Sequence, residues 1–155
     1  MMAEMDPRDR FLGCLLGGAA GDALGMPAEG YTALEIQSLF GRIEDMLPAP
    51  EGHFHAGFRA GQFTDDTEET LMLAESLIEH SGFSADEFSR KLIRWGSAWD
   101  SDERLSSGVG FATRSAVERM IAGIPWQESG MDIPTCGSAI RSAPIGLLYH
   151  ADLGL

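Results

Sequence analysis

The stretch GQFTDDTEETLML, residues 61 to 73, decides the fold class and raises the functional question. From Leu71 to Ile78 the apolar residues recur at the spacing of one helix face, which predicts a helix over residues 64–80. Directly before that pattern, four carboxylates crowd into the five positions from Asp65 to Glu69. The helix explains the apolar residues, but so much negative charge at its start needs a second explanation.

The same helical spacing recurs along the chain. Besides residues 64–80, it covers residues 11–25, 32–40, 84–99, 110–122 and 137–150. Residues 41–63 form the longest irregular stretch and are rich in proline and glycine, and a long loop of that kind is more often functional than idle. Sustained alternation with β-branched residues, the mark of a strand, is absent from the sequence. The sequence therefore predicts an all-α fold, with residues 1–155 as a single domain.

Composition restricts the classes of partner. The formal net charge of −13 disfavours a groove for nucleic acid or an anionic membrane surface, since both need clustered lysine and arginine. The two cysteines, Cys14 and Cys136, lack the spacing of a zinc or redox motif and the density of a disulfide scaffold. These features predict a protein of the cytoplasm.

The N-terminal run FLGCLLGGAAGDALG, residues 11–25, carries glycines every four residues. Each glycine lowers helix propensity by up to about 1 kcal/mol relative to alanine, so the repeat suggests another backbone close to that face. The run resembles a targeting segment, but its leader is acidic, Asp22 interrupts it, and it is short for a bilayer. We therefore expect a tightly packed core helix rather than an export signal or a membrane span.

Two interpretations of the TDDT turn, residues 64–67, remain open on local chemistry. Threonine and aspartate cap exposed N–H groups at a helix start, Asp66 with Glu69 fits a capping box, and early acids complement the helix dipole. Thr64, Asp65 and Asp66 also offer hard oxygen ligands in several directions, as Mg²⁺ or Ca²⁺ requires. A divalent cation would relieve the repulsion between the neighbouring carboxylates.

Four motifs in order resemble a known family. They are GDALGMPAE at 21–29, GQFTDDTEETLMLAESL at 61–77, GVGFATRSA at 108–116 and CGSAIRSAPIGLLY at 136–149. In that order and spacing, the chain from about Asp9 to His150 resembles the N-terminal half of the ADP-ribosylglycohydrolase family, of the dinitrogenase-reductase-activating glycohydrolase type. The resemblance implies a compact orthogonal helical bundle. It also implies Mg²⁺-dependent cleavage of the glycosidic bond, N-linked or O-linked, between ADP-ribose and a modified side chain, most often arginine.

The resemblance assigns roles residue by residue. Thr64, Asp65 and Asp66 match the metal ligands of the family's TDDT turn, and Asp65 is counted with the catalytic residues. Glu29, in the PxE turn, matches an acidic residue near the reacting ribose, and we expect it to act in acid/base catalysis or in gating the metal cleft. Gly137 and Ser138 resemble the segment that approaches ADP-ribose, where N–H groups suit a diphosphate.

The chain ends at HADLGL, before the second Asp-x-Asp-Thr cluster that completes the family's dinuclear Mg²⁺ site. The resemblance thus supplies half of the metal ligands, and the domain is expected to be partial and C-terminally truncated. The unpartnered apolar faces suggest a homo-oligomer, or a C-terminal half as partner. The alternative to an enzyme is a non-catalytic ADP-ribose-binding or oligomerising remnant of the same fold.

The remaining polar groups receive structural interpretations. Glu68 and Glu69 are expected to be surface acids at the helix start, and Asp22 a structural residue of the first helix. His53 and His55 form an HxH pair without a nearby cysteine or third histidine, which favours a solvated loop over a zinc site.

Overall fold

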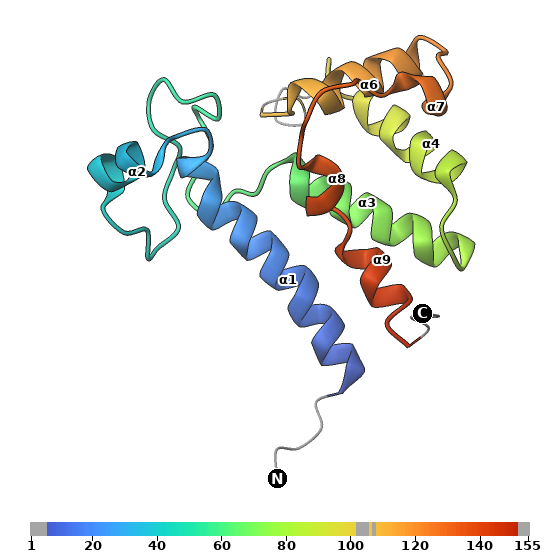
Figure 1. Cartoon of the computed structure of the whole chain (residues 1–155), viewed down its shortest axis with the longest axis horizontal. Coiled ribbons are helices and arrows are strands. Elements are labelled where there is room, and N and C mark those ends of the chain that lie inside the picture. Colours follow the sequence, from blue (N-terminus) through green and yellow to red (C-terminus); the bar gives the residue numbers. More distant parts are fainter. Residues whose placement is uncertain (1–5, 102–105, 107, 152–155) are drawn as a thin grey trace. The chain divides into compact units, whose positions relative to one another are not determined.

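The computed structural model describes residues 6–101, 106 and 108–151. Every regular element in that part of the chain is helical (Figure 1), which confirms the predicted all-α class. The chain divides into two compact units, Met1–Thr64 and Asp65–Leu155, and each is described by itself. The assignment of residues 1–155 to a single domain stays a prediction.

The first unit contains a long helix, a 3₁₀ turn and a short helix: α1 (Pro7–Gly25), η1 (Met26–Ala28) and α2 (Ala33–Phe40). The carboxylate of Asp6 caps α1 by accepting from the N–H of Arg8 at 2.9 Å. At the start of α2, Thr32 and Glu35 form a capping box, which specifies its first residue. Residues 41–63 contain turns and bends and no helix, as predicted.

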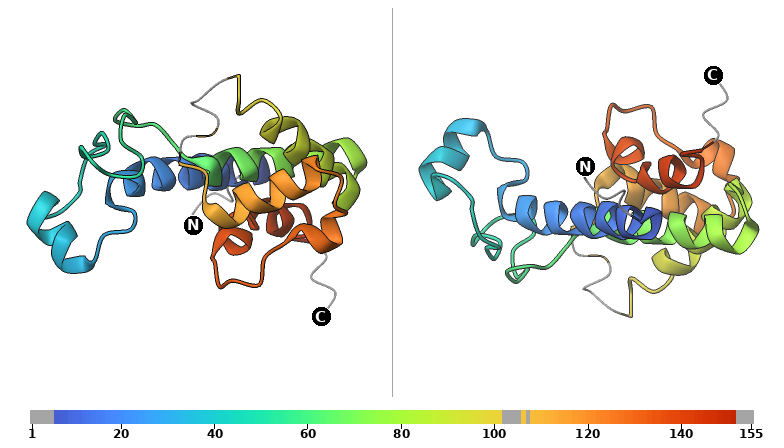
Figure 2. Two further views of the ribbon diagram at one scale, coloured as in Figure 1. Left: turned by 90° about the horizontal axis from the view of Figure 1, so that it is seen from above. Right: turned by 90° about the horizontal axis from the view of Figure 1, so that it is seen from below.

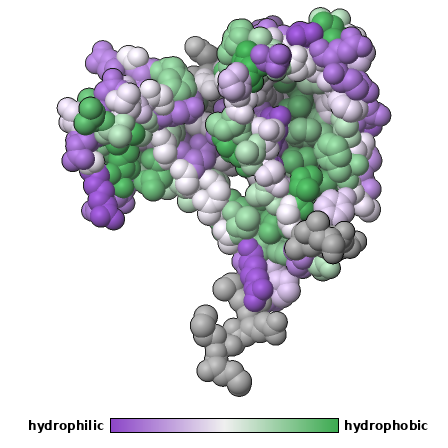
Figure 3. Space-filling model, viewed as in Figure 1, coloured by the Kyte–Doolittle hydropathy of each residue, from purple (hydrophilic) through white to green (hydrophobic). Residues whose placement is uncertain are grey.

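Helix α2 is stabilised more by its cap than by burial. None of its residues is fully buried. On the face shown in Figure 3, hydrophobic side chains reach the surface over α2, where Leu34 and Leu39 are 84% and 56% exposed.

The glycine repeat of α1 has no close neighbour among the described residues of the first unit. A Cβ atom added at Gly13, Gly17, Gly21 or Gly25 would meet no heavy atom of that unit within 4 Å, so the close backbone that the repeat suggested stays a prediction. The run also passes the length test that we expected it to fail. Together α1 and η1 give 22 residues, Pro7–Ala28, long and apolar enough to cross a membrane by length and composition. Core helices of soluble proteins and signal sequences pass the same test.

The second unit is a set of packed helices around an apolar core. Its longer helices are α3 (Asp65–His80), α4 (Ala85–Gly96) and α6 (Phe111–Ile121), followed by the short α7 (Trp126–Ser129). Helix α4 packs against both α3 and α6 (Figure 2). Its last residue, Gly96, permits the close approach, because a Cβ there would lie 2.2 Å from Cγ1 of Val117. The buried core residues are Leu92, Trp99, Val117 and Met120.

The helix expected over residues 137–150 is two short helices, α8 (Gly137–Ile140) and α9 (Ala143–Leu148). Pro144 explains the division, because it lacks an N–H and its ring would clash with the carbonyl of Ile140 in a continuous helix. Both short helices pack against α3. The break leaves Arg141 in the turn between them, where its side chain can reach α3.

Candidate functional site

Thr64, the residue directly before α3, is fixed by Asp22 of α1. The N–H of Thr64 donates to Oδ2 of Asp22 and its hydroxyl donates to Oδ1, both at 2.9 Å. Thr64 is buried and Asp22 is half-buried. The hydroxyl proton of Thr64 therefore points at Asp22, which fixes the orientation of this hydroxyl. The expected structural role of Asp22 is therefore specific: it orients a predicted metal ligand.

Asp65 and Asp66 occupy the first two positions of α3 and are half-buried. Their negative charges lie at the positive end of the helix dipole, which stabilises them as carboxylates. Oδ2 of Asp65 accepts from the N–H of Gly110, the residue before α6, at 3.3 Å. The motif at 108–116 thus contacts the TDDT turn through its backbone.

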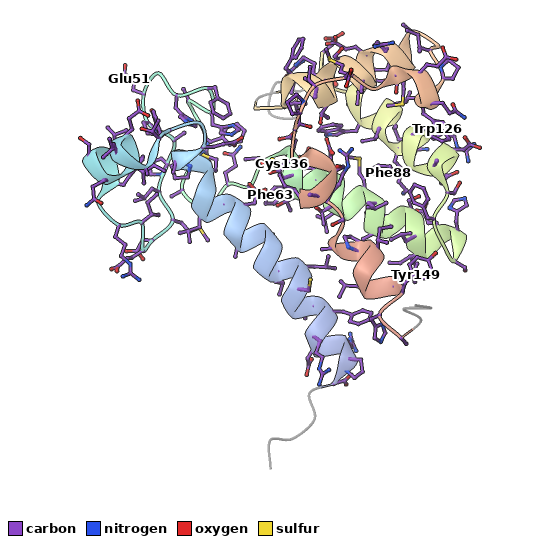
Figure 4. The ribbon with its side chains drawn as sticks, viewed as in Figure 1. Glu51, Phe63, Phe88, Trp126, Cys136 and Tyr149 are labelled. Carbon is purple, nitrogen blue, oxygen red and sulfur yellow. The ribbon has the colours of Figure 1, made fainter. Side chains whose placement is uncertain are left out.

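Glu69 is buried and forms an ion pair with Arg141, so its assignment as a surface acid was wrong. The helix begins at Asp65, which places Asp66 and Glu69 inside it instead of at the ends of a capping box. Oε1 of Glu69 is buried and has no hydrogen-bond partner among the described residues. The guanidinium of Arg141 lies 5.8 Å from the ring centre of Phe88 on α4 (Figure 4).

Besides burial, the charges of Asp65 and Asp66 affect the pKa of Arg141. Burial lowers the pKa of Arg141 below its ordinary value, and the negative charges of Asp65 and Asp66 partly oppose that effect. The motif at 136–149 is thereby connected to the start of α3. Part of the charge repulsion at the TDDT turn is relieved by an arginine of the chain itself.

Glu68 is half-buried rather than a surface acid. It accepts a hydrogen bond from Nε1 of Trp95 on α4 at 2.7 Å. Trp95 in turn packs edge-on against Trp99, with 4.9 Å between the ring centres. The hydrogen bond to Glu68 thus satisfies the indole N–H of Trp95 at the edge of the core.

Glu29 ends the 3₁₀ turn of the first unit and is held by two buried histidines. Nε2 of His55 lies 2.8 Å from Oε2 of Glu29, and Nε2 of His53 lies 2.7 Å from the Glu29 carbonyl oxygen. Both histidines are buried, so the expected solvated loop was wrong. Helical periodicity says nothing about turns, and the HxH spacing was therefore the only sequence signal for this contact.

Gly137 and Ser138 form the first turn of α8, with Gly137 half-buried and Ser138 exposed. They lie close in sequence to Arg141, whose ion pair with Glu69 connects their segment to α3. The binding role of the two residues stays a prediction.

Arg141 was not predicted as a member of the site. Its signal was its place within the motif CGSAIRSAPIGLLY, but charge alone could not identify Glu69 as its partner. The pairing depends on the break between α8 and α9.

Another group of potential metal ligands lies at the far end of α3. Ligand atoms of Glu79, His80 and Glu87 lie within 4.8 Å of one another. Two of these acids are already paired, Glu79 with Lys91 and Glu87 with Arg90. Arg90 lowers the pKa of Glu87, the effect expected of a surface ion pair. This group is an ordinary charged surface.

The donor set at the TDDT turn fits Mg²⁺. Two carboxylates and an oriented hydroxyl, from three consecutive residues, are hard oxygen ligands of the type that this ion prefers. The ion also keeps several water ligands, so a few protein ligands are compatible with binding.

Comparison with known proteins agrees with the geometry. A family model described as ADP-ribosylglycohydrolase matches residues 3–154. A protein of Archaeoglobus fulgidus is 41% identical over 95% of this chain and 45% of its own length. An ADP-ribosylarginine hydrolase, Tri1 of Pseudomonas putida, is 35% identical over 94% of this chain and 38% of its own. The chain thus spans less than half the length of these relatives.

A solved structure titled an ADP-ribosylglycohydrolase-related protein complex shares the fold. It superposes with a TM-score of 0.68 and 31% sequence identity, over 91% of this chain and 43% of the other. The family match over nearly the whole chain and this structural similarity lead to one conclusion: the chain belongs to the ADP-ribosylglycohydrolase family.

Proposed function

We propose that this chain carries one half of the active site of a Mg²⁺-dependent ADP-ribosyl hydrolase, which cleaves the bond between ADP-ribose and a modified side chain, most often arginine. The observation that carries the proposal is a set of contacts that the motifs make within each unit. In the second unit, Gly110 contacts Asp65 and Arg141 contacts Glu69. In the first unit, Asp22 contacts Thr64. The names of the relatives support the reaction.

Thr64, Asp65 and Asp66 would hold the metal. The ion would supply a Lewis acid that orients a water molecule and the ribose hydroxyls. Asp22 keeps the Thr64 hydroxyl oriented, and Arg141 moderates the charge of the two aspartates. In this proposal the protein acts in the cytoplasm. It obtains the remaining metal ligands from a further segment, a second copy or a partner chain.

Glu29 would transfer the proton. Cleavage at the anomeric carbon develops positive charge on the ribose ring, and a carboxylate can take a proton from the attacking water. Gly137 and Ser138 would face the diphosphate of the substrate, where main-chain N–H groups suit its negative charge.

The experiment tests whether the purified chain hydrolyses ADP-ribosyl-arginine, and it measures the ADP-ribose that is released. We expect activity with Mg²⁺, none with excess chelator, and a loss of about 100-fold or more in Asp65→Asn. Asp132→Asn, which neutralises an exposed aspartate of the same unit, is the matched control and should keep full activity. Activity unchanged in Asp65→Asn would refute the site assignment.

The alternative is a non-catalytic ADP-ribose-binding or oligomerising protein of the same fold. Calorimetric titration with ADP-ribose distinguishes the two. If ADP-ribose binds in a Mg²⁺-dependent way but ADP-ribosyl-arginine is not hydrolysed, the alternative is supported. If ADP-ribose binds and ADP-ribosyl-arginine is hydrolysed, the enzyme is supported.

A further inference from the structure

Glu29 lies where little in its own segment can fix it. It follows the 3₁₀ turn in an extended conformation, and its side chain is 56% exposed. A carboxylate that moves a proton must nevertheless be held in place, because effective acid/base catalysis needs hydrogen-bond geometry. What holds it must come from elsewhere in the chain.

His53 and His55 supply two contacts of different kinds. His53 reaches the main-chain carbonyl of Glu29, whereas His55 reaches its carboxylate. The two imidazoles come from positions 24 and 26 residues further along the chain. Backbone and side chain of Glu29 are therefore held independently. Oε1 of Glu29 has no hydrogen-bond partner among the described residues of the first unit, which leaves this oxygen for a reacting group.

The hydrogen-bond pattern assigns the imidazole protons. The main-chain N–H of His55 donates to Nδ1 of His53 at 3.2 Å. Nδ1 of His53 therefore carries a lone pair, and the proton of this ring is on Nε2. The Glu29 carbonyl can only accept, which agrees with a donating Nε2–H. An ionised carboxylate likewise only accepts, so Nε2 of His55 also carries a proton.

Aromatic packing fixes the two imidazoles. The ring centres of Tyr31 and His53 are 5.2 Å apart. The ring centre of His55 lies 4.1 Å from that of Phe54 and 5.0 Å from that of Phe58. Phe54 also covers Gly30, whose φ of +78° favours glycine and where a Cβ would come within 3.3 Å of the Phe54 ring. Gly30, beside Glu29, thus packs against Phe54, beside His55, which stabilises the contact between Glu29 and His55.

We infer that His53 and His55 are positioning residues for Glu29: His53 fixes its backbone, and His55 fixes one carboxylate oxygen so that the other faces the substrate. This inference rests on the proposed function for its catalytic meaning, but the geometric part can be tested without any activity.

The first test is nuclear magnetic resonance of the chain with ¹⁵N-labelled histidine. We expect a proton on Nε2 of both rings and a lone pair on Nδ1 of His53. Glu29→Ala removes the acceptor of His55 and keeps the main-chain carbonyl that His53 contacts. Its His55 Nε2 signal should shift and exchange faster with water, while the His53 signal stays in place. A proton on Nδ1 of His53, or a His55 signal that ignores Glu29→Ala, would overturn the inference whether or not the chain is an enzyme.

The second test compares two replacements of His55. The amide nitrogen of glutamine extends far enough to replace Nε2 as a donor to Glu29, whereas that of asparagine is too short. We expect kcat to fall about 10–100-fold in His55→Asn with KM nearly unchanged, and to recover most of the wild-type value in His55→Gln. Equal losses in both variants, with equally low thermal stability, would show a structural role only. If the wild-type chain by itself hydrolyses nothing, the resonance test still decides the histidine contacts.

Discussion

The two units of this chain are stabilised in different ways. In the second unit, helices close around an apolar core in which Val117 packs against Gly96. In the first, polar contacts together with aromatic packing fix the segment after α2: Asp22 holds Thr64, and His55 holds Glu29 and packs against Phe58. Apolar packing tolerates change of sequence, but a polar contact depends on its donor and acceptor. The predicted catalytic residue Glu29 belongs to the unit with polar contacts.

The largest expected effect concerns the ion pair between Arg141 and the buried Glu69 in the second unit. Arg141→Met should leave the carboxylate of Glu69 buried without its partner and destabilise the chain by about 3–5 kcal/mol. Urea unfolding followed by circular dichroism measures the loss. The double variant Arg141→Met with Glu69→Leu should recover most of it, because no buried charge remains. A stable single variant would mean that this pair contributes little.

A polar anchor of the first unit should come next. Asp22→Asn keeps the shape but turns one acceptor into a donor facing Thr64, at a cost of about 1.5–3 kcal/mol. The same unfolding assay measures it, and Asp9→Asn in the first turn of α1 is the control. An equal, small effect in both variants would contradict the contrast between the units.

Gly96→Ala tests the apolar core. Its Cβ would overlap with Val117, and we expect a loss of about 1–3 kcal/mol despite the better helix propensity of alanine. Adding Val117→Ala removes the overlapping atoms, so the double variant should lose less than the sum of the two single ones. Strict additivity would show that the two residues do not touch.

The smallest effect should come from Gly17→Ala. Because a Cβ there meets no described atom within 4 Å, the variant should gain up to about 1 kcal/mol of helix stability. Circular dichroism and thermal unfolding detect the gain. Destabilisation would show that another backbone does lie against α1 in solution, as the glycine repeat first suggested.

The sequence predicted what periodicity controls. The helices α3 and α6 begin within one residue of their expected starts. It could not predict contacts between residues far apart in the chain. The roles of Glu69 and His55 depend on such contacts, and both residues were therefore placed at the surface when they are buried.

The Asp22–Thr64 contact also has a consequence for folding order. It closes a loop across 42 positions, and the contact between Glu29 and His55, which spans 26 positions, lies inside that loop. Closing the inner loop first shortens the free chain that the outer contact must then bring together, which reduces its entropic cost. The histidines that hold Glu29 thereby also help to bring Thr64 to Asp22.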